Sequence, residues 1–511
     1  MNRIRNCCLL FASMLVCAAA GASAEPVALR YEDFGAVGDG IADDQAALLA
    51  THVRANACNA PVRARDGATY RIGGGRAVIP VMTDVDFGTA RFVIDDRAVE
   101  DARLPVFHVV SRHSPVRVDG VGPVCRGQAN LGVTLPARSL VLLSAVGRRQ
   151  FVRKGANANR GSDQHEWVVA APNGDVASSA PVVWDYGTNV SVTAYPIDAA
   201  ELTLKGGTFV TVANANAGPR TVYYVRGICV ERSNVRLEGV RHEVEGEGEV
   251  GSPYRGFVTI LHAADVTMSG CVVCGHRVYR DSVGTPHGSY DISVNESVGV
   301  RLRGCVQSND IDDASRWGVF TSNYSKDLVL EDCRLSRFDA HCGVCNVTIC
   351  RSTLGHQGVN VTGFGLLRLE DSTVRGGALV NLRKDYGSFW NGDFKIRNCR
   401  FVPRRAKAKM PCLFGAQNDG THDFGYPCMM PRSIEIDGLV IADSPHPNRS
   451  VGAYVFADPN PANTNAAYAS PYPYAVTERV KLLDVRTESG LPLRISPNPW
   501  MFRHLTKGES K

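Results

Sequence analysis

A short pattern of alternating apolar and polar residues recurs along the second half of the chain. Its eight copies are VRLEGV (235–240), VTMSGC (266–271), VRLRGC (300–305), LVLEDC (328–333), VTICRS (347–352), LRLEDS (367–372), FKIRNC (394–399) and IEIDGL (434–439). Alternation with a period of two residues predicts a β-strand with one buried face. Successive copies begin roughly 19 to 40 residues apart, the spacing of single coils in a solenoid. We therefore predict parallel strands that stack one coil above the next.

The sixth position of the repeat carries small residues in most copies. These residues are Val240, Cys271, Cys305, Cys333, Ser352, Ser372 and Cys399. In a parallel β-helix each coil places the same position above its predecessor, so this position is expected to form an internal column. Cysteine suits such a column as a small apolar residue. A disulfide ladder is the alternative, but stacked positions on parallel strands are poorly oriented for bridging, and we predict buried free thiols.

A glycine-rich acidic stretch, DFGAVGDGIADDQAALLA (33–50), precedes the first expected coil. Its glycines at 35, 38 and 40 favour turns. Asp43 and Asp44 stand at the N-cap position of a short apolar helix, which is expected to run from about Asp44 to Arg54. A solenoid exposes apolar core at its ends, so we predict that this helix caps the first coil.

The segment DFGAVGDGIADD (33–44) resembles the N-terminal signature of the pectate-lyase-like right-handed parallel β-helix superfamily. That superfamily includes polygalacturonases, related lyases and phage tailspikes, and the resemblance extends in general form over roughly residues 30 to 440. It implies an all-β fold, a right-handed parallel β-helix solenoid with an N-terminal capping helix. It says less about chemistry, because function resides in a site and not in the scaffold.

Composition shifts divide the chain into five predicted parts. Residues 1–24 form a signal peptide, with Arg3 and Arg5 before an apolar run and the sequence Ala-Ser-Ala at 22–24 as the cleavage site. Residues 25–126 are expected to hold the cap and first coils, 127–200 a hairpin-rich insertion, 201–443 the β-helix core with its groove, and 444–511 a loop and last strand. We therefore expect an exported protein without a membrane span.

Six glycosylation sequons fall in the chain, several of them within predicted strands where a glycan does not fit. They begin at Asn189, Asn295, Asn323, Asn346, Asn360 and Asn448. Together with the short signal peptide they indicate a bacterial protein that is secreted or periplasmic. The net charge of +5 is small and both signs are interspersed, so no nucleic-acid partner is predicted.

Cysteine usage gives little support for a metal centre. Removal of the signal peptide leaves thirteen of the sixteen cysteines, an odd number. The spacing of Cys342, Cys345 and Cys350 loosely resembles a metal knuckle, but a second complete ligand pair is missing. No metal and no cofactor is predicted, and an oligomer remains possible.

Two clusters of polar residues break the repeat and carry the candidate chemistry. In RFDAH, Arg337, Asp339 and His341 alternate, so an extended backbone places them on one face. In NLRKDYGSFW, Arg383 and Asp385 alternate in the same way, with Lys384, Tyr386 and Trp390 nearby. About two coils separate the clusters, within reach of one sugar-binding groove. Paired carboxylates can act as acid and base on a glycosidic bond, and arginines can hold an acidic group.

The order of clusters also resembles a degenerate polygalacturonase signature. The resemblance assigns Asp291 to the first block, Asp339 to the aspartate pair, His356 within GHQG (355–358) to the G-H-G block, and Arg383–Lys384 to the last block. The departures are substantial, because Ala340 stands in the aspartate pair and Gln357 is inserted in G-H-G. The resemblance therefore carries over the position of the site and not an intact mechanism.

The leading hypothesis is an exported enzyme that hydrolyses a polysaccharide or oligosaccharide. Asp339 and Asp385 are the expected acid/base carboxylates, assisted by His341 and Tyr386. The expected substrate-binding residues are Arg337, Arg383, Lys384, His356, Asp291 and Trp390. Two alternatives stay open: β-elimination on a uronate, with His341 or Tyr386 as base, and a β-helix that only binds glycan. His356 is equally compatible with a loop role, and Trp390 with core packing.

Overall fold

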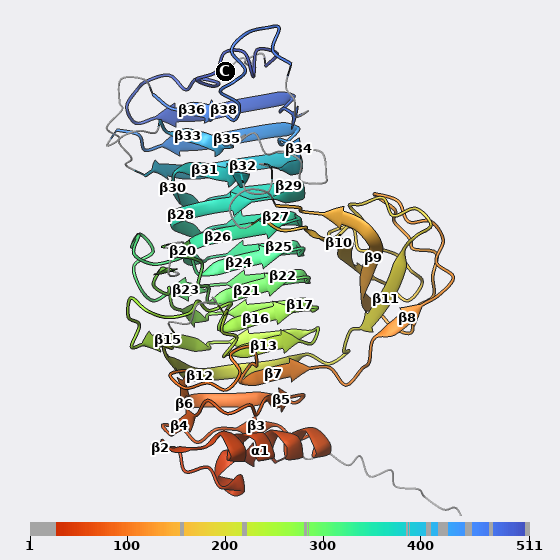
Figure 1. Cartoon of the computed structure of the whole chain (residues 1–511), viewed down its shortest axis with the longest axis vertical. Helices are drawn as coiled ribbons and strands as arrows, with labels where there is room; N and C mark the ends of the chain where they lie inside the picture. The colour runs from red at the N-terminus through yellow and green to blue at the C-terminus, as the bar shows by residue number, and fades with distance from the viewer. Residues whose placement is uncertain are drawn as a thin grey trace, which may run out of the picture.

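In the computed structural model, successive coils of the chain stack along one long axis, from the helix α1 at one end to the strand β38 at the other (Figure 1). The structure describes residues 27–505 except 154–157, 217–221, 281–283, 285, 385–386, 388, 405–409, 417–427, 445–451 and 470–473. The predicted signal peptide lies outside the described residues. A 30-stranded sheet runs the length of the stack and makes parallel pairings, as the repeat predicted.

The repeated pattern forms the first column of strands. Val235 pairs with Val266, Val266 with Val300, and Val300 with Leu328, and the same register continues through Ile434. The column consists of β14 (Val235–Glu238), β17 (Ala264–Ser269), β22 (Val298–Arg303), β25 (Lys326–Glu331), β27 (Val344–Cys350), β29 (Gly363–Glu370) and the first parts of β32 (Trp390–Pro403), β35 (Ser433–Ile441) and β38 (Arg479–Thr487). The predicted repeat is therefore confirmed.

Two further columns complete each coil. The second contains β15 (Arg241–Glu245), β18 (Val272–Val273), β23 (Val306–Gln307), the first parts of β26 (Arg334–Cys342) and β28 (Thr353–Val361), and β30 (Thr373–Gly376). The third contains β7 (Phe107–Val110), β13 (Ile228–Glu231), β16 (Val258–Leu261), β21 (Ile292–Asn295), β24 (Phe320–Asn323), the last parts of β26 and β28, β31 (Ala378–Leu382), β33 (Cys412–Gly415) and β36 (Tyr454–Phe456). Two small pairings lie outside these columns, β19 (Tyr279–Arg280) with β20 (Pro286–His287) and β34 (Cys428–Met429) with β37 (Tyr474–Ala475).

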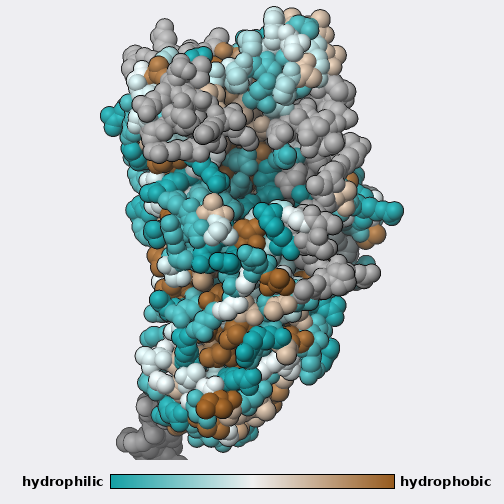
Figure 2. Space-filling view, turned by 60° about the vertical axis from the view of Figure 1, so that its left-hand side comes forward, coloured by the Kyte–Doolittle hydropathy of each residue, from teal (hydrophilic) through white to brown (hydrophobic). Residues whose placement is uncertain are grey.

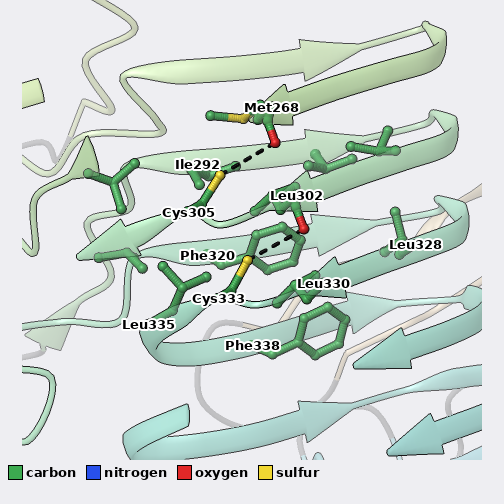
Figure 3. Packing of buried hydrophobic residues seen from close by; sticks show 14 of the residues in the cluster. Met268, Ile292, Leu302, Cys305, Phe320, Leu328, Leu330, Cys333, Leu335 and Phe338 are labelled. Carbon is green, nitrogen blue, oxygen red and sulfur yellow. Dashed lines mark hydrogen bonds between the residues drawn. The ribbon is translucent and has the colours of Figure 1, made fainter. Parts of the chain in front are cut away.

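The sixth position of the repeat lies in the interior, as predicted. Cys271, Cys305, Cys333 and Cys399 are buried and carry free thiols. Each thiol donates a hydrogen bond to a carbonyl of the preceding coil; Cys305 Sγ lies 3.5 Å from the Met268 oxygen and Cys333 Sγ 3.4 Å from the Leu302 oxygen (Figure 3). Phe320 and Phe338 stack one coil apart in the same interior, with ring centroids 5.0 Å apart. Identical positions thus pack on one another along the axis.

The predicted cap is also present. Helix α1 (Gln45–Cys58) contacts η1 (Tyr31–Phe34), β1 (Leu29–Arg30), β3 (Val62–Arg63) and β5 (Ile79–Val81), and its Leu48 and Ala55 are buried in the main core. Asp44 is the N-cap residue, yet its carboxylate accepts hydrogen bonds from the Val37 and Gly38 amides, at 2.7 and 3.2 Å. The glycine-rich motif is therefore a turn that Asp44 ties to the helix. The first coils follow as β2 (Asp39–Asp43), β4 (Thr69–Ile72), β6 (Val85–Asp95) and β12 (Leu202–Val212).

An insertion between β7 and β12 projects from one side of the stack (Figure 1). It is a four-stranded antiparallel sheet in the order β10 (Ser162–Ala170), β9 (Ser139–Gln150), β11 (Ser191–Pro196) and β8 (Val116–Val118). Because β8 belongs to this sheet, the inserted structure begins before residue 127, where the sequence pattern placed its start. The strand β8 has mostly exposed side chains, which explains why hydrophobic patterning did not separate it from the first coils.

A buried ion pair joins the insertion to the β-helix. Lys326 at the start of β25 pairs with Glu166 on β10, and its ammonium also donates to the Pro181 carbonyl at 2.5 Å. Glu166 accepts the Val183 and Trp184 amides at 2.9 and 3.0 Å. These contacts offset the free-energy cost of removing both charges from water.

Histidines and glutamates alternate along the same junction. Glu231 lies 2.6 Å from His108 and 3.6 Å from His262, whose other nitrogen lies 3.0 Å from Glu296. Glu296 also accepts the Trp167 indole N–H at 3.1 Å, and the Trp167 ring stacks on His262 with centroids 4.8 Å apart. Burial alone lowers the pKa of His262, but Glu231 and Glu296 outweigh it and raise this pKa to about 9.

Substitutions in the cysteine column test the packing. Cys305→Ser is expected to cost about 1 kcal/mol or less of unfolding free energy, because serine already occupies the column at 352 and 372 and its hydroxyl can donate to the Met268 carbonyl. Cys305→Leu is expected to cost about 1–3 kcal/mol through overpacking. Denaturant-induced unfolding measures both, with exposed Cys58→Ser as control. Equal stability of the Ser and Leu variants would contradict internal stacking.

The histidine–glutamate junction predicts a pH dependence. A pKa raised in the folded state adds stability that is fully present below the unfolded value of 6.5 and is lost as pH rises through about 9. We expect the melting temperature to fall across this interval, and His262→Gln to flatten that slope. Differential scanning calorimetry from pH 6 to 10 measures both, with exposed His113→Gln as control. An unchanged slope in His262→Gln would rule out this residue as the source.

Candidate functional site

The candidate site lies at the corner between the second and third columns, where long connections leave the coils. These connections are residues 274–291 between β18 and β21 and residues 308–319 between β23 and β24. Figure 2 shows this side of the molecule, with a hollow of hydrophilic surface in its upper half. The strand β26 crosses this corner without a connection, and it carries the predicted RFDAH cluster.

Asp339 on β26 is the centre of the cluster and is fully buried. Its carboxylate pairs with Arg337 on the same strand and with Arg383, whose Nη1 lies 2.5 Å from Oδ1. The strand register places Asp339 beside Asn360 and Asn360 beside Asn381, so Arg383 arrives from two coils further along. The predicted spacing of two coils is therefore confirmed, and the two arginines meet on one carboxylate.

This environment keeps Asp339 ionised. Burial favours the neutral acid, but the guanidinium groups of Arg337 and Arg383 outweigh burial and hold the pKa of Asp339 well below its usual range. A carboxyl group with so low a pKa is a poor proton donor and a weak proton acceptor near neutral pH. Its geometry therefore favours an anchoring role for Asp339 over the acid/base role expected from the sequence.

His341 and Tyr290 are the proton-carrying groups next to this carboxylate. His341 Nε2 lies 3.2 Å from Asp339 Oδ2 and 3.4 Å from the Tyr290 hydroxyl, while its Nδ1 lies 2.9 Å from Thr321 Oγ1. Burial lowers the pKa of His341 below 6.5 against the opposing effect of Asp339, and Arg383 lowers it further, so the imidazole is neutral at pH 7. Burial raises the pKa of Tyr290 to about 12, so its hydroxyl is protonated.

A cavity of about 770 Å³ adjoins the cluster, within the size range of ligand sites. Gln357, which lines the cavity, accepts a hydrogen bond from Arg337 at 2.8 Å, and the Arg337 guanidinium lies over the Trp317 ring, 5.3 Å from its centroid. Asn360 and the exposed Lys384 line the same cavity. Two predicted residues are therefore connected to this cavity, because Lys384 lines it and Arg337 donates to Gln357 in its lining.

Three predicted residues lie elsewhere. Asp291 is fully buried and pairs with His242, 2.6 Å away, so it faces the interior. Trp390 is also fully buried, donates to the Gly365 carbonyl at 3.1 Å and packs on Phe394, which makes it a core residue and not a surface for sugar stacking. His356 is largely buried, with Nδ1 2.9 Å from the Ile311 carbonyl. Asp385 and Tyr386 lie outside the described residues.

Sequence patterning assigned neither Thr321 nor Gln357 to the site, and it gave Tyr290 no role in proton transfer. Tyr290 precedes β21 and Thr321 lies on β24, in the coils before β26, while Gln357 lies on β28 in the coil after it. Thr321 lies in the coil directly beneath the RFDAH cluster, but this register of β24 on β26 comes from the structure, because β24 lies outside the repeated pattern. Tyr290 ends a long connection, where no alternation of apolar and polar residues indicates which way its side chain points.

Comparison with solved structures identifies the fold. Pseudomonas phage phi297 tailspike gp61 aligns over 91% of this chain and 83% of its own, with 13% identity and a TM-score of 0.50. The gp54 tailspike of Acinetobacter baumannii bacteriophage AP22, solved in complex with A. baumannii capsular saccharide, aligns over 94% and 79%, with 10% identity and a TM-score of 0.52. No family model and no curated protein sequence matches the chain. The fold is a right-handed parallel β-helix.

The electrostatics of the cluster can be tested by titration. Asp339 raises the pKa of His341 whereas both arginines lower it, so Asp339→Asn is expected to lower the His341 pKa further below 6.5. Nuclear magnetic resonance of carbon-13-labelled histidine measures this value. Asp312→Asn, in a separate ion pair with Arg375, serves as control and is expected to leave it unchanged. A rise in the His341 pKa after Asp339→Asn would contradict the described arrangement.

Proposed function

We propose that this β-helix protein binds an acidic polysaccharide beside Asp339 and cleaves it by β-elimination, with His341 as the base. The AP22 tailspike, which shares the fold, was solved with a capsular saccharide, and this supports a glycan as the ligand class. The observation that carries the proposal is the single buried carboxylate held between two arginines, next to a neutral histidine.

The charge of the cluster favours an acidic ligand. Arg337 and Arg383 exceed the one carboxylate of Asp339 by one positive charge. Lys384, exposed at the cavity, adds a second. The cavity lining also includes Asp458, which offsets Lys384, so the net excess is the one positive charge of the arginines around Asp339. Guanidinium groups bind carboxylates in bidentate geometry and neutralise them, which is the requirement for removing a proton next to a uronate carboxylate.

The protonation states favour elimination over hydrolysis. In the proposed step, neutral His341 takes the proton from the carbon next to the uronate carboxylate, and the released electron pair forms a carbon–carbon double bond as the bond to the glycosidic oxygen breaks. The protonated Tyr290 hydroxyl donates its proton to that oxygen and is re-protonated from His341, 3.4 Å away. Asp339, 3.2 Å from Nε2, stabilises the transient imidazolium.

Hydrolysis requires a second carboxyl group that can donate a proton. Asp339 does not meet this requirement, because its two arginine partners keep it ionised. Asp385 is the other predicted carboxylate and lies outside the described residues, so hydrolysis stays a prediction. A purely binding role uses the same arginines and differs only in giving no product.

The products distinguish these functions. With a uronate-containing polysaccharide, elimination is expected to give an unsaturated sugar that absorbs in the ultraviolet, with no oxygen taken from labelled water. His341→Gln and Tyr290→Phe are each expected to lower kcat by about 10²- to 10⁴-fold, the usual contribution of acid–base groups. Lys384→Ala is expected to raise KM with little change in kcat. The carboxyl-reduced form of the same polysaccharide serves as control substrate.

Saturated products that contain one oxygen from labelled water would establish hydrolysis instead. If no product forms while Arg383→Ala still weakens glycan binding, the protein is a binding module. Full activity of both His341→Gln and Tyr290→Phe would remove this site from consideration.

A further inference from the structure

A second polar cluster lies inside the β-helix, apart from the cavity. His242 lies on β15, His276 follows β18 and Asp291 immediately precedes β21, so the three residues come from neighbouring coils at the corner between the second and third columns. Their exposed fractions are 1%, 1% and 0%. A carboxylate and two imidazoles so completely buried in an apolar solenoid need a compensating partner.

The side chains converge with one atom each. His242 Nδ1, His276 Nε2 and an Asp291 oxygen all lie within 4.8 Å of one another. His242 Nδ1 is 2.6 Å and His276 Nε2 is 3.5 Å from Asp291 Oδ1. His276 Nε2 makes no hydrogen bond within the part of the chain that the structure describes, although it is buried and aimed at this point. The cluster therefore has an unused ligand atom at its centre.

The outer atoms of all three residues are already held. The second nitrogen of His242 lies 2.9 Å from Thr211 Oγ1, and His276 Nδ1 lies 2.9 Å from Glu247 Oε1. Asp291 Oδ2 accepts the Cys274 amide at 2.6 Å. Such outer partners orient histidine ligands in metal sites, and a carboxylate on the second imidazole nitrogen is a recurring arrangement. Glu247 is itself fixed by the Tyr279 hydroxyl at 2.8 Å.

We infer that His242 Nδ1, His276 Nε2 and Asp291 Oδ1 bind a divalent transition-metal ion, with zinc as the ion that this ligand set favours. Two imidazoles and one carboxylate suit Zn²⁺, whose bonds to nitrogen and oxygen are about 2.0–2.2 Å long. A tetrahedral site places such ligands about 3.3 Å apart, so His242 Nδ1 and Asp291 Oδ1 separate by less than about 1 Å when the ion enters. The carboxylates of Asp291 and Glu247 balance its two charges. Arg316 also lies 3.8 Å from Glu247, but its charge is balanced by Asp313 at 3.2 Å.

The ion has a structural consequence for the neighbouring site. Asp291 directly follows Tyr290, whose hydroxyl approaches Asp339 and His341. Binding of Asp291 to an ion inside the coil fixes the backbone from which Tyr290 projects. The metal site is thus a positioning element, and its existence does not depend on the reaction proposed above.

The experiment measures metal content directly. The full chain is purified without chelator, analysed by inductively coupled plasma mass spectrometry, stripped with chelator and titrated with zinc chloride by calorimetry. We expect about one zinc ion per chain and a higher melting temperature in the zinc-loaded protein. Cobalt substitution is expected to give visible absorption from an ion bound by nitrogen and oxygen ligands.

Variants assign the site. His276→Gln is expected to abolish stoichiometric binding, and Glu247→Gln, which keeps all three ligands, is expected to weaken zinc affinity about 10- to 100-fold. The matched control is His108→Gln, in the other group of metal-type side chains among the described residues, His108, Cys229 and Glu231. Failure of the stripped chain to bind zinc or cobalt would overturn the inference. Loss of binding in His108→Gln with retention in both other variants would also overturn it.

Discussion

Parallel pairing in register is the constraint on which the rest of this structure depends. Neighbouring strands lie about 4.8 Å apart, so every inward side chain packs directly on its counterpart in the adjacent coils. The column from Cys271 through Cys305 to Cys333 shows the consequence, because a residue there must be small enough for the coil above and below it. The same stacking leaves apolar surface open at the N-terminal end, which α1 covers.

The solenoid interior is apolar, so each charge that enters it requires a partner. Glu166 pairs with Lys326 where the insertion joins the stack, and Asp96 pairs with Arg226 at 3.0 Å near the N-terminal end. Asp339 with its two arginines and Asp291 with its two histidines follow the same principle at the corner between the second and third columns. Each of these buried carboxylates therefore has a basic side chain as its partner.

The two clusters at this corner are connected through the backbone. Tyr290 reaches toward Asp339, whereas the next residue, Asp291, turns into the coil. These two neighbouring residues thereby contribute to the cluster of Asp339 and to the cluster of His242 and His276. Both residues end the long connection between β18 and β21, where the chain departs from regular coil geometry.

Local alternation in the sequence determined which residues face inward within each strand. It was sufficient to predict the first column, the buried cysteines and the common placement of Arg337, Asp339 and His341, while glycine turns and an N-cap aspartate predicted the capping helix. Only the tertiary structure decided which strands lie beside one another at each height, because the connections between repeats differ in length. For that reason the sequence did not indicate that Thr321 and Gln357 belong to the site. It also did not indicate that Asp291 and Trp390 are internal or that β8 is part of the insertion. The low pKa of Asp339 likewise depends on Arg383, which the sequence placed about two coils away without showing that its guanidinium meets this carboxylate.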